Sequence, residues 1–277
     1  MILVDMNQVS ISSIMVQINR TKNSDTNLIR HLILNTIRSV RTRFHREYGE
    51  LVLCYDSSNN WRRDYYSYYK HSRKESRSKS SLDWGEIFNN LSTIQNELIK
   101  NFPYKVIKVD RAEGDDVIAV IANNSQEKVL IVSSDKDFKQ LLNNKIQQYN
   151  LLTKKFVEVE EGFLMEQVIR GDKSDGVPNI LSADDSFANG VRQTPISKKK
   201  LESLKEGILF DFVNLPYEVQ RNYERNNTLI NLSMIPEPIQ NDILMEYKYY
   251  KVNNRSGLLN YFIKNRLSNL TENITEF

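Results

Sequence analysis

Acidic residues stand at or just beyond the ends of five short apolar runs in the first 175 residues. The runs read ILVD (2–5), LVLCYD (51–56), YKVIKVD leading into AEGDD (104–116), VLIVSSDKD (129–137) and VIRGDKSD (168–175). Short, nearly continuous Val, Ile and Leu runs are typical of strands buried on both faces of a parallel sheet. Ligands of such sheets bind beyond the carboxyl ends of the strands. We therefore expect one crevice lined by nine carboxylates, namely Asp5, Asp56, Glu113, Asp115, Asp116, Asp135, Asp137, Asp172 and Asp175.

This acidic crevice predicts a metal-dependent phosphodiesterase. So many negative charges cannot share a small site without cations, and ligands that are all oxygen favour Mg²⁺, with Mn²⁺ as a substitute. Two such ions, about 3.5–4 Å apart, generate a hydroxide nucleophile and neutralise the phosphate and the leaving oxygen. The spacing of Asp135 and Asp137 suits the bridging of two ions from one turn.

Composition and charge limit the remaining possibilities. With 277 residues, 40% hydrophobic and 26% charged, the chain has the profile of a globular protein with a substantial core. The single cysteine, Cys54, lies inside an apolar run and excludes disulfides and zinc–thiolate sites within the chain. No run reaches the ~20 apolar residues of a membrane span, and the chain begins with a strand pattern instead of a signal peptide. We expect an intracellular, cytoplasmic protein.

Strand-like and helix-like segments alternate up to about residue 160. Residues 26–47 and 82–101 have apolar side chains at helical spacing, and a third helix is expected after the acidic residues 113–116. Alternating β and α units predict an α/β domain, residues 1–175, whose mostly parallel sheet is flanked by helices. Beyond residue 176 the strand signals fade, which predicts a helical C-terminal region over 176–277.

Residues 57–81 interrupt this alternation with a polar, basic and aromatic segment. Positions 62–80 hold seven basic residues against two acidic ones, on a chain whose net charge is +3. The segment's Ser, Arg and Lys content predicts mobility in the absence of a ligand. Basic side chains contact phosphate and tyrosines stack on unpaired bases of any sequence. The candidate nucleic-acid contacts are Arg62, Arg63, Tyr65, Tyr66 and Tyr69. Helical spacing also predicts that two of the four tyrosines at 65, 66, 68 and 69 pack against the domain.

Four motifs of the chain resemble those of the structure-specific 5′-nucleases. They read AEGDDVIA (112–119), SSDKDF (133–138), RGDKSDGVP (170–178) and YYKHSR (68–73). This family contains flap endonucleases, the 5′-nuclease domain of bacterial DNA polymerase I and phage 5′→3′ exonucleases. Along the whole chain the resemblance is greatest to its T-even phage RNase H branch, through RHLILN (30–35), NWRRDYYSYYK (60–70) and LTENITEF (270–277).

The resemblance implies a PIN-like fold with a helical arch at residues 57–81. It also implies a phage-encoded 5′→3′ exonuclease with flap endonuclease activity, which removes RNA primers and adjacent DNA from lagging-strand fragments and leaves 5′-phosphate and 3′-hydroxyl ends. Its substrates would be DNA and RNA–DNA duplexes with 5′ ends or flaps. A single-strand-binding protein or a sliding clamp is a candidate partner, and we expect a monomer. The alternatives are a PIN-type ribonuclease and a non-catalytic DNA-junction binder.

The resemblance also implies roles for individual residues. It places one group of carboxylates around the catalytic ion and a second group, Asp137, Asp172 and Asp175, towards a more distant position. The first group is Asp5, Asp56, Glu113, Asp115, Asp116 and Asp135. Lys70 and Arg73 correspond to the catalytic arch residues.

The chain departs from the family after the GDKSD motif. Gly176 stands where the family has Asn, and the G-x-G turn that often holds K⁺ does not follow. The resemblance therefore implies a modified helix–turn–helix, with its second helix near 196–206, and leaves open whether a K⁺ site exists. Positive side chains at a helix start attract phosphate. We expect Lys198, Lys199 and Lys200 to bind duplex there.

Overall fold

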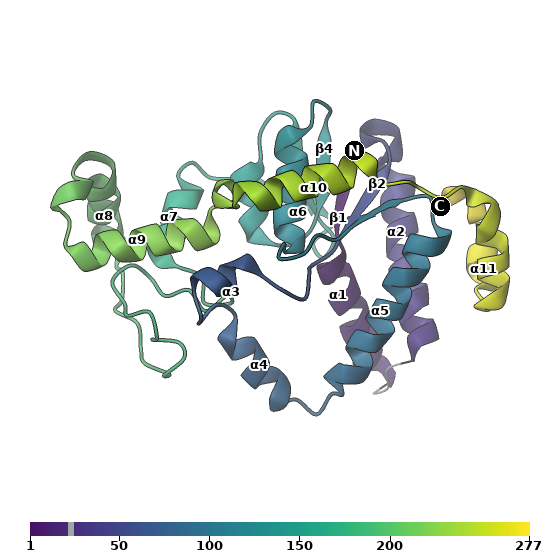
Figure 1. Cartoon of the computed structure of the whole chain (residues 1–277), viewed down its shortest axis with the longest axis horizontal. Coiled ribbons are helices and arrows are strands. Elements are labelled where there is room, and N and C mark those ends of the chain that lie inside the picture. The colour runs from purple at the N-terminus through teal and green to yellow at the C-terminus, as the bar shows by residue number, and fades with distance from the viewer. Residues whose placement is uncertain (22–24) are drawn as a thin grey trace. The chain divides into compact units, whose positions relative to one another are not determined.

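The computed structural model of the chain describes residues 1–21 and 25–277 (Figure 1). It divides into two compact units. The first, here called the sheet unit, comprises Met1–Ser58, Asp83–Val157 and Pro238–Phe277. The second, the helical unit, comprises Asn59–Leu82 and Glu158–Glu237. This division differs from the expected boundary at residue 175, because residues 59–82 belong with later helices and residues 238–277 return to the sheet unit.

The described residues of the sheet unit form a six-stranded sheet with the order β3-β2-β1-β4-β5-β6. Its strands are β1 (Ile2–Asp5), β2 (Leu51–Cys54), β3 (Lys105–Ile107), β4 (Val129–Val132), β5 (Ile146–Asn150) and β6 (Lys155–Phe156). The first five are parallel and β6 pairs antiparallel with β5. Every residue of β1, β2 and β4 is buried, which explains their continuous apolar sequence. The mostly parallel sheet is therefore confirmed.

Helices cover both faces of this sheet. The crossovers from β1 to β2 and from β2 to β3 contain α1 (Met6–Thr21), α2 (Thr26–Tyr48) and α5 (Trp84–Asn101), whereas α6 (Gly114–Asn124) leads into β4. Right-handed crossovers put α6 on the opposite face, because the chain reverses its winding direction after β3. Figure 1 shows α2 and α5 on one side of the strands and α6 on the other. The expected helices at 26–47 and 82–101 correspond to α2 and α5.

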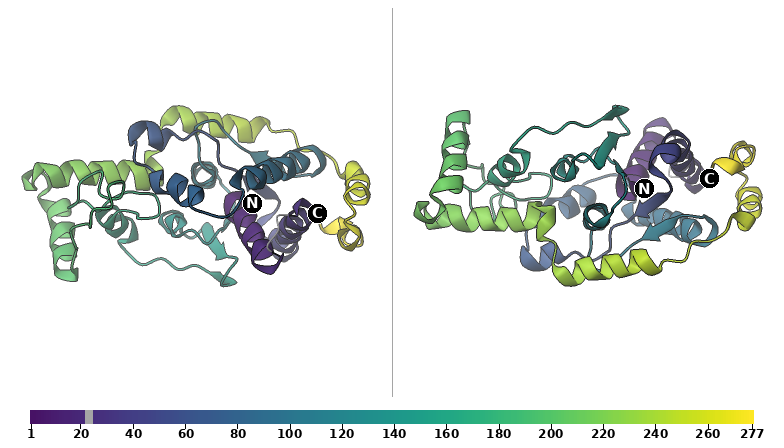
Figure 2. Two further views of the ribbon diagram at one scale, coloured as in Figure 1. Left: turned by 90° about the horizontal axis from the view of Figure 1, so that it is seen from below. Right: turned by 90° about the horizontal axis from the view of Figure 1, so that it is seen from above.

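The end of the chain completes the core of the sheet unit. It contains α10 (Glu237–Tyr249), α11 (Leu258–Lys264) and α12 (Ser268–Thr271), and in Figure 2 the last helices lie beside α2 and α5. The fully buried Phe277 packs against Phe102 and Phe262, with ring centroids 5.8 and 5.2 Å apart. Short 3-10 helices occur at η1 (Lys136–Leu141), η2 (Phe212–Asn214), η3 (Leu232–Met234), η4 (Arg255–Gly257) and η5 (Ile274–Glu276).

The helical unit contains α3 (Trp61–Tyr65), α4 (His71–Ser78), α7 (Phe163–Arg170), α8 (Lys198–Phe210) and α9 (Tyr217–Ile230). The expected second helix of the helix–turn–helix, near 196–206, corresponds to α8. One apolar cluster joins Tyr66 and Tyr69 to α7 and α9, and another joins α7 to α8 and α9. Tyr66 and Tyr69 thus belong to the core of this unit, whereas Arg63, Tyr65 and Ser67 are exposed. The expected mobility of residues 57–81 without a ligand stays a prediction.

Candidate functional site

Three neighbouring strands bring carboxylates to one edge of the sheet unit. Asp5 ends β1, Asp56 follows β2 and Asp135 follows β4. Because β2, β1 and β4 are adjacent and parallel, their carboxyl ends meet at the same edge. The winding direction of the chain changes between β1 and β4, and such switch points are where open α/β sheets bind ligands.

Asp5 is the buried centre of this edge. Its carboxylate accepts hydrogen bonds from the Gln8 backbone N–H (3.0 Å) and the Ser133 hydroxyl (2.8 Å). Burial raises the pKa of Asp5 to about 6, and the negative charges of Asp56 and Asp135 add to the rise against those hydrogen bonds. In the absence of a metal ion, ionisation of Asp5 therefore costs free energy. A cation at this edge would stabilise the ionised form.

The first turn of α6 faces Asp56. The backbone N–H of Gly114 donates to Asp56 Oδ1 at 2.6 Å, and a Cβ at position 114 would stand 3.1 Å from the same oxygen. Glu113 caps the helix, and its N–H donates to Asp116 Oδ2 at 2.9 Å. Asp115 and the fully buried Asp116 follow in the first turn, where the helix dipole favours negative charge. The helix start thus adds three carboxylates to the sheet unit.

Asp135 and Asp137 occupy the start of η1. Asp135 Oδ1 accepts the N–H of Asp137 at 2.9 Å, so the two residues form one turn, as their spacing indicated. The N–H of Asp135 donates to the Ser133 hydroxyl at 3.0 Å, and this hydroxyl donates to Asp5. Ser133 therefore connects the two carboxylates that follow β1 and β4.

Sequence reasoning missed Ser133 and Gln148 as supporting residues. The buried Gln148 side chain donates to the carbonyl oxygens of Ser133 (2.9 Å) and Asp135 (2.7 Å), which fixes the backbone that follows β4. The available signal was weak, because Gln148 stands in a polar stretch, IQQYN, in which only burial distinguishes it from the exposed Gln147.

The seven carboxylates of the sheet unit fit a hard divalent cation by donor type. They offer oxygen alone, and burial raises the pKa of Asp5, with a smaller contribution from the charges of Asp56 and Asp135. Within residues 1–21 and 25–277, no three Asp, Glu, His or Cys side chains converge closely enough to form a ready-made metal site.

Asp172 and Asp175 belong to the helical unit. The buried Asp172 side chain accepts the N–H and the hydroxyl of Ser174 (2.7 and 2.5 Å), which shapes a tight turn. The Asp175 carboxylate accepts from the Tyr69 hydroxyl and from Arg73, both at 2.8 Å. These two carboxylates thus build a turn and bind cationic side chains, and their expected role at a second metal stays a prediction.

Lys70 and Arg73 both pair with Asp175. Lys70 Nζ lies 3.5 Å from Asp175 Oδ2 and 4.9 Å from the centre of the Tyr69 ring, and its backbone N–H donates to the Asp175 carbonyl at 2.7 Å. The Lys70 side chain is 9% exposed and that of Arg73 is 44% exposed. The structure therefore joins the YYKHSR and GDKSD motifs within the helical unit and leaves Arg73 the more accessible of the two.

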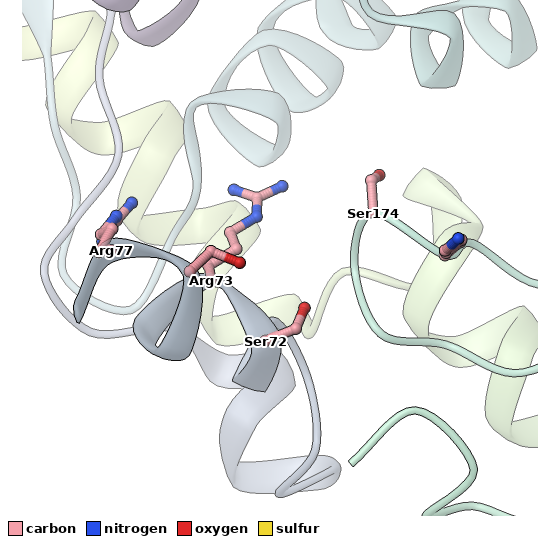
Figure 3. A pocket seen from close by; sticks show the side chains of 6 residues that line it. Ser72, Arg73, Arg77 and Ser174 are labelled. Atoms are coloured by element: carbon pink, nitrogen blue, oxygen red, sulfur yellow. The ribbon is translucent and has the colours of Figure 1, made fainter. Parts of the chain in front are cut away.

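An open pocket of about 580 Å³ adjoins Arg73 (Figure 3). Its lining consists of three basic and three hydroxyl side chains, namely Ser72, Arg73, Ser76, Arg77, Lys173 and Ser174. Burial lowers the pKa of Arg77, and the positive charges of Arg73 and Arg63 lower it further. Clustered cations with hydroxyl donors suit an anion such as a phosphate group. Sequence reasoning selected only Arg73 from this group, because the serines of a basic segment look like linker residues.

Burial changes the set of candidate nucleic-acid contacts. Arg62 is 2% exposed and donates to the carbonyl of Leu229 at 2.8 Å. The buried Tyr66 donates its hydroxyl to the carbonyl of Asp184, and the buried Tyr69 donates to Asp175. The expected phosphate contact of Arg62 and base stacking of Tyr66 and Tyr69 do not fit this packing.

Tyr65 and Arg63 remain exposed on α3 and keep their proposed roles. The same holds for the three lysines that begin α8. Lys198, Lys199 and Lys200 are exposed, and the Ser197 hydroxyl caps this helix by accepting the N–H of Lys200 at 3.2 Å. The described surface thus keeps one exposed arginine on α3 and one basic helix start, that of α8, as candidate phosphate contacts.

Comparison with known families divides the chain into two matched parts. Residues 1–169 match a family described as 5′-3′ exonuclease, N-terminal resolvase-like domain, and residues 158–277 match one described as T4 RNase H, C terminal. Ribonuclease H of Enterobacteria phage T4 is 33% identical over 292 residues, covering 99% of this chain and 95% of the relative. An exodeoxyribonuclease of Enterobacteria phage T3 is 31% identical over 188 residues, covering 64% of this chain and 59% of the relative.

Solved structures with the same fold come from phage T5. A T5 5′-exonuclease with bound divalent zinc ions has a TM-score of 0.59 at 14% identity, covering 89% of this chain and 97% of the other. A T5 flap endonuclease in a pseudo-enzyme-product complex with DNA and metal ions has a TM-score of 0.58 at 15% identity, covering 89% and 98%. At these identities the likeness concerns the fold, and it confirms the expected PIN-like nuclease architecture.

Proposed function

Because the chain belongs to the 5′–3′ exonuclease family, a family of phosphodiester hydrolases, we propose that it removes RNA primers and adjacent DNA from lagging-strand fragments. It acts as a 5′→3′ exonuclease with flap endonuclease activity and leaves 5′-phosphate and 3′-hydroxyl ends. The observation that carries the proposal is the meeting of Asp5, Asp56 and Asp135 at the switch point of the sheet. The likeness to a phage ribonuclease H over 99% of the chain supports primer removal as the biological task.

The proposed cofactor is Mg²⁺, as two ions, with Mn²⁺ as a substitute. The sheet-unit residues that would hold them are Asp5, Asp56, Glu113, Asp115, Asp116, Asp135 and Asp137. Bound ions of this kind supply an activated water and neutralise charge on the scissile phosphate. The chain itself positions the ligands: Ser133 fixes Asp5 relative to Asp135, and the Gly114 backbone fixes Asp56. Asp172 and Asp175 remain candidate ligands of the second ion.

The helical unit has the task of binding phosphate. Lys70 offers a point charge, and Arg73 offers a planar fork that can bind two phosphate oxygens. Asp175 orients both side chains before substrate arrives. The basic pocket beside Arg73 then accepts a neighbouring phosphate, and the lysines that start α8 contact duplex backbone.

The substrates in this proposal are DNA and RNA–DNA duplexes with 5′ ends or flaps, and the protein acts as a monomer. A single-strand-binding protein or a sliding clamp is the proposed protein partner. Two observations disfavour the alternatives. The match of residues 158–277 to a ribonuclease H C-terminal domain argues against a small PIN-type ribonuclease. A non-catalytic junction binder would be expected to lose acidic residues, whereas all nine are present. In the described part of the chain, no helix is long and apolar enough to cross a membrane.

The deciding experiment follows a 5′-labelled RNA–DNA strand annealed to DNA, and a 5′-flap duplex, with Mg²⁺, Mn²⁺, Ca²⁺ or EDTA. We expect stepwise release from the 5′ end and flap cleavage with Mg²⁺ or Mn²⁺ only. Ligation of the shortened strand and phosphatase treatment of the released products would identify the ends. Cleavage that starts at 3′ ends, or that is equally fast in EDTA, would contradict the proposal.

A further inference from the structure

Side chains of α9 hold the backbone loop that links α7 to the segment before α8. This loop, residues 177–186, follows the GDKSD motif. The Asn226 amide donates to the carbonyl oxygens of Val168 and Pro178, both at 2.8 Å. The Asn222 amide donates to those of Ile180 (3.0 Å) and Ser182 (3.1 Å). Both asparagines are buried. Their amide groups therefore donate hydrogen bonds to four carbonyl groups that water does not reach.

Arg225 adds a positive charge to the same place. Positions 222, 225 and 226 share one face of α9 because they are three and four residues apart. The buried Arg225 guanidinium donates to the Pro178 carbonyl (2.9 Å), to Asn226 Oδ1 (2.8 Å) and to the Asp184 carboxylate. Its carbon lies 5.7 Å from the centre of the Tyr66 ring. The guanidinium is therefore a cation enclosed by oxygen atoms and an aromatic ring.

The family's K⁺ does not fit this loop. In relatives with the G-x-G turn, a bound K⁺ would be coordinated by oxygen atoms, as backbone carbonyls do in other K⁺ sites. Here the carbonyl groups of Val168, Pro178, Ile180 and Ser182 already accept side-chain N–H groups. The Arg225 guanidinium, paired with the Asp184 carboxylate, already supplies a positive charge beside the Pro178 carbonyl.

We propose that Arg225, with Asn222 and Asn226, replaces a bound monovalent metal ion in shaping the 177–186 loop. Duplex binding by the helical unit is then independent of which monovalent cation is present. This inference rests on the proposed function, because its main readout is binding of duplex DNA. Arg225 and the two asparagines are positioning residues and contact no substrate.

The first test compares cations with the wild-type protein. A 5′-flap duplex is titrated with the protein in Ca²⁺, so that no turnover occurs. The titration is repeated in the chloride salts of K⁺, Na⁺, Li⁺ and N-methylglucamine. All four salts are used at the same ionic strength, so that the release of counterions from DNA is held constant. We expect one Kd in all four salts, and tighter binding in KCl alone would overturn the inference. The thermal unfolding midpoint is measured in the same salts without DNA. A higher midpoint in KCl would also overturn it, whereas failure to bind duplex in any salt would count against the proposed function.

The second test removes the built-in cation. Arg225→Met should weaken duplex binding by ~10-fold, and millimolar methylguanidinium should restore part of the affinity. Arg221→Met is the matched control, since Arg221 lies on the same helix, pairs with the same Asp184 (3.1 Å) and is 43% exposed. Wild-type affinity of Arg225→Met, or equal rescue of the control, would refute the assignment.

A third variant covers the case in which Arg225→Met does not fold. Asn222→Ala frees the carbonyl groups of Ile180 and Ser182 and keeps the guanidinium. We expect its unfolding midpoint to become higher in KCl than in LiCl, since a metal ion can now reach those oxygens. An unfolding midpoint that stays independent of the cation would show that these amides do not stand in for an ion.

Discussion

At the scale of single residues, neutral polar side chains position the carboxylates of the sheet unit. Asp5, Asp56 and Asp135 follow apolar runs, and the structure brings all three to one sheet edge. Ser133 and Gln148 hold that edge together, yet a serine and a glutamine carry no pattern that distinguishes them from surface residues. Polar side chains acquire such roles only through partners that are distant in sequence.

Asp135→Asn should abolish cleavage and leave duplex binding unchanged or tighter, because the change removes a metal ligand and one crowded negative charge. Single-turnover cleavage in Mg²⁺ and binding in Ca²⁺ measure the two properties. The matched control is Asp110→Asn, an exposed acid that follows β3. A cleavage rate near that of wild type in the Asp135 variant would remove this residue from the metal centre.

The raised pKa of Asp5 predicts a pH dependence of stability. The folded carboxyl titrates at about 6 and an ordinary one at 3.8, so between these values the folded chain binds more protons than the unfolded chain. This contribution to stability is complete below pH 3.8 and is lost as the pH rises through 6. Asp5→Asn should remove the loss, as measured by urea unfolding across that window in EDTA. Equal pH slopes for wild type and variant would contradict the buried-carboxyl interpretation.

At the scale of elements, helices and strands were largely predictable, as was the packing of two of the four tyrosines between residues 65 and 69. Which two tyrosines pack, and the burial of Arg62, were not predictable. Continuous apolar runs gave the strands, and helical spacing gave α2 and α5. In contrast, Arg62, Tyr66 and Tyr69 have the composition of a nucleic-acid surface, although they pack against α7 and α9. Their polar ends are satisfied by the carbonyls of Leu229 and Asp184 and by the Asp175 carboxylate, which local sequence cannot reveal.

The first turn of α6 gives a prediction for an element boundary. Gly114→Ala would press a Cβ on Asp56 Oδ1 and tilt that carboxylate, so we expect slower cleavage and a higher Mg²⁺ requirement at an unchanged unfolding midpoint. Gly257→Ala is the control, because a Cβ there meets no described atom within 4 Å. The metal requirement is measured by titrating Mg²⁺ in single-turnover assays. Equal requirements in both variants would refute the role of the Gly114 contact.

The turn after α7 needs a glycine for space as well as for conformation. Gly171 has φ of +70°, and a Cβ there would lie 2.3 Å from the Val177 carbonyl oxygen. Gly190 has φ of +66° with no described atom within 4 Å of such a Cβ. Gly190→Ala should cost ~1–2 kcal/mol of unfolding free energy from backbone strain alone, and Gly171→Ala clearly more. Denaturant unfolding measures both, and equal losses would show that the close approach is unimportant.

At the scale of the whole molecule, the fold class was predictable and the division into units was not. The separation of residues 59–82 from the strands around them depends on packing with α7 and α9. The return of residues 238–277 to the sheet unit depends on aromatic contacts such as that of Phe277 with Phe102. Neither contact can be predicted from the residues of the segment that makes it.

Chemistry and duplex binding should respond to different substitutions. Lys70→Ala and Arg73→Ala should lower the single-turnover rate more than the affinity, because charge on the scissile phosphate grows in the transition state. Combined Lys198→Ala, Lys199→Ala and Lys200→Ala should weaken duplex binding and reduce its salt slope by up to ~0.9 per lost phosphate contact. Binding titrations across salt, paired with kinetics at saturating enzyme, separate the two effects. The opposite pattern would reverse these roles.

The interleaved order of the sheet unit has a consequence for synthesis on the ribosome. Its hydrophobic core needs Phe277 against Phe102, and the Arg41 side chain donates to the Glu276 carbonyl at 3.3 Å. The strands emerge early, but their apolar neighbours stay unprotected until residues 238–277 have been translated and can dock. Contacts so distant in sequence close slowly, and exposed strand edges favour aggregation in the meantime. A nascent chain stalled before residue 238 should therefore depend on chaperones. A chain that is complete to residue 277 and tethered to the ribosome by a long linker should already be resistant to protease.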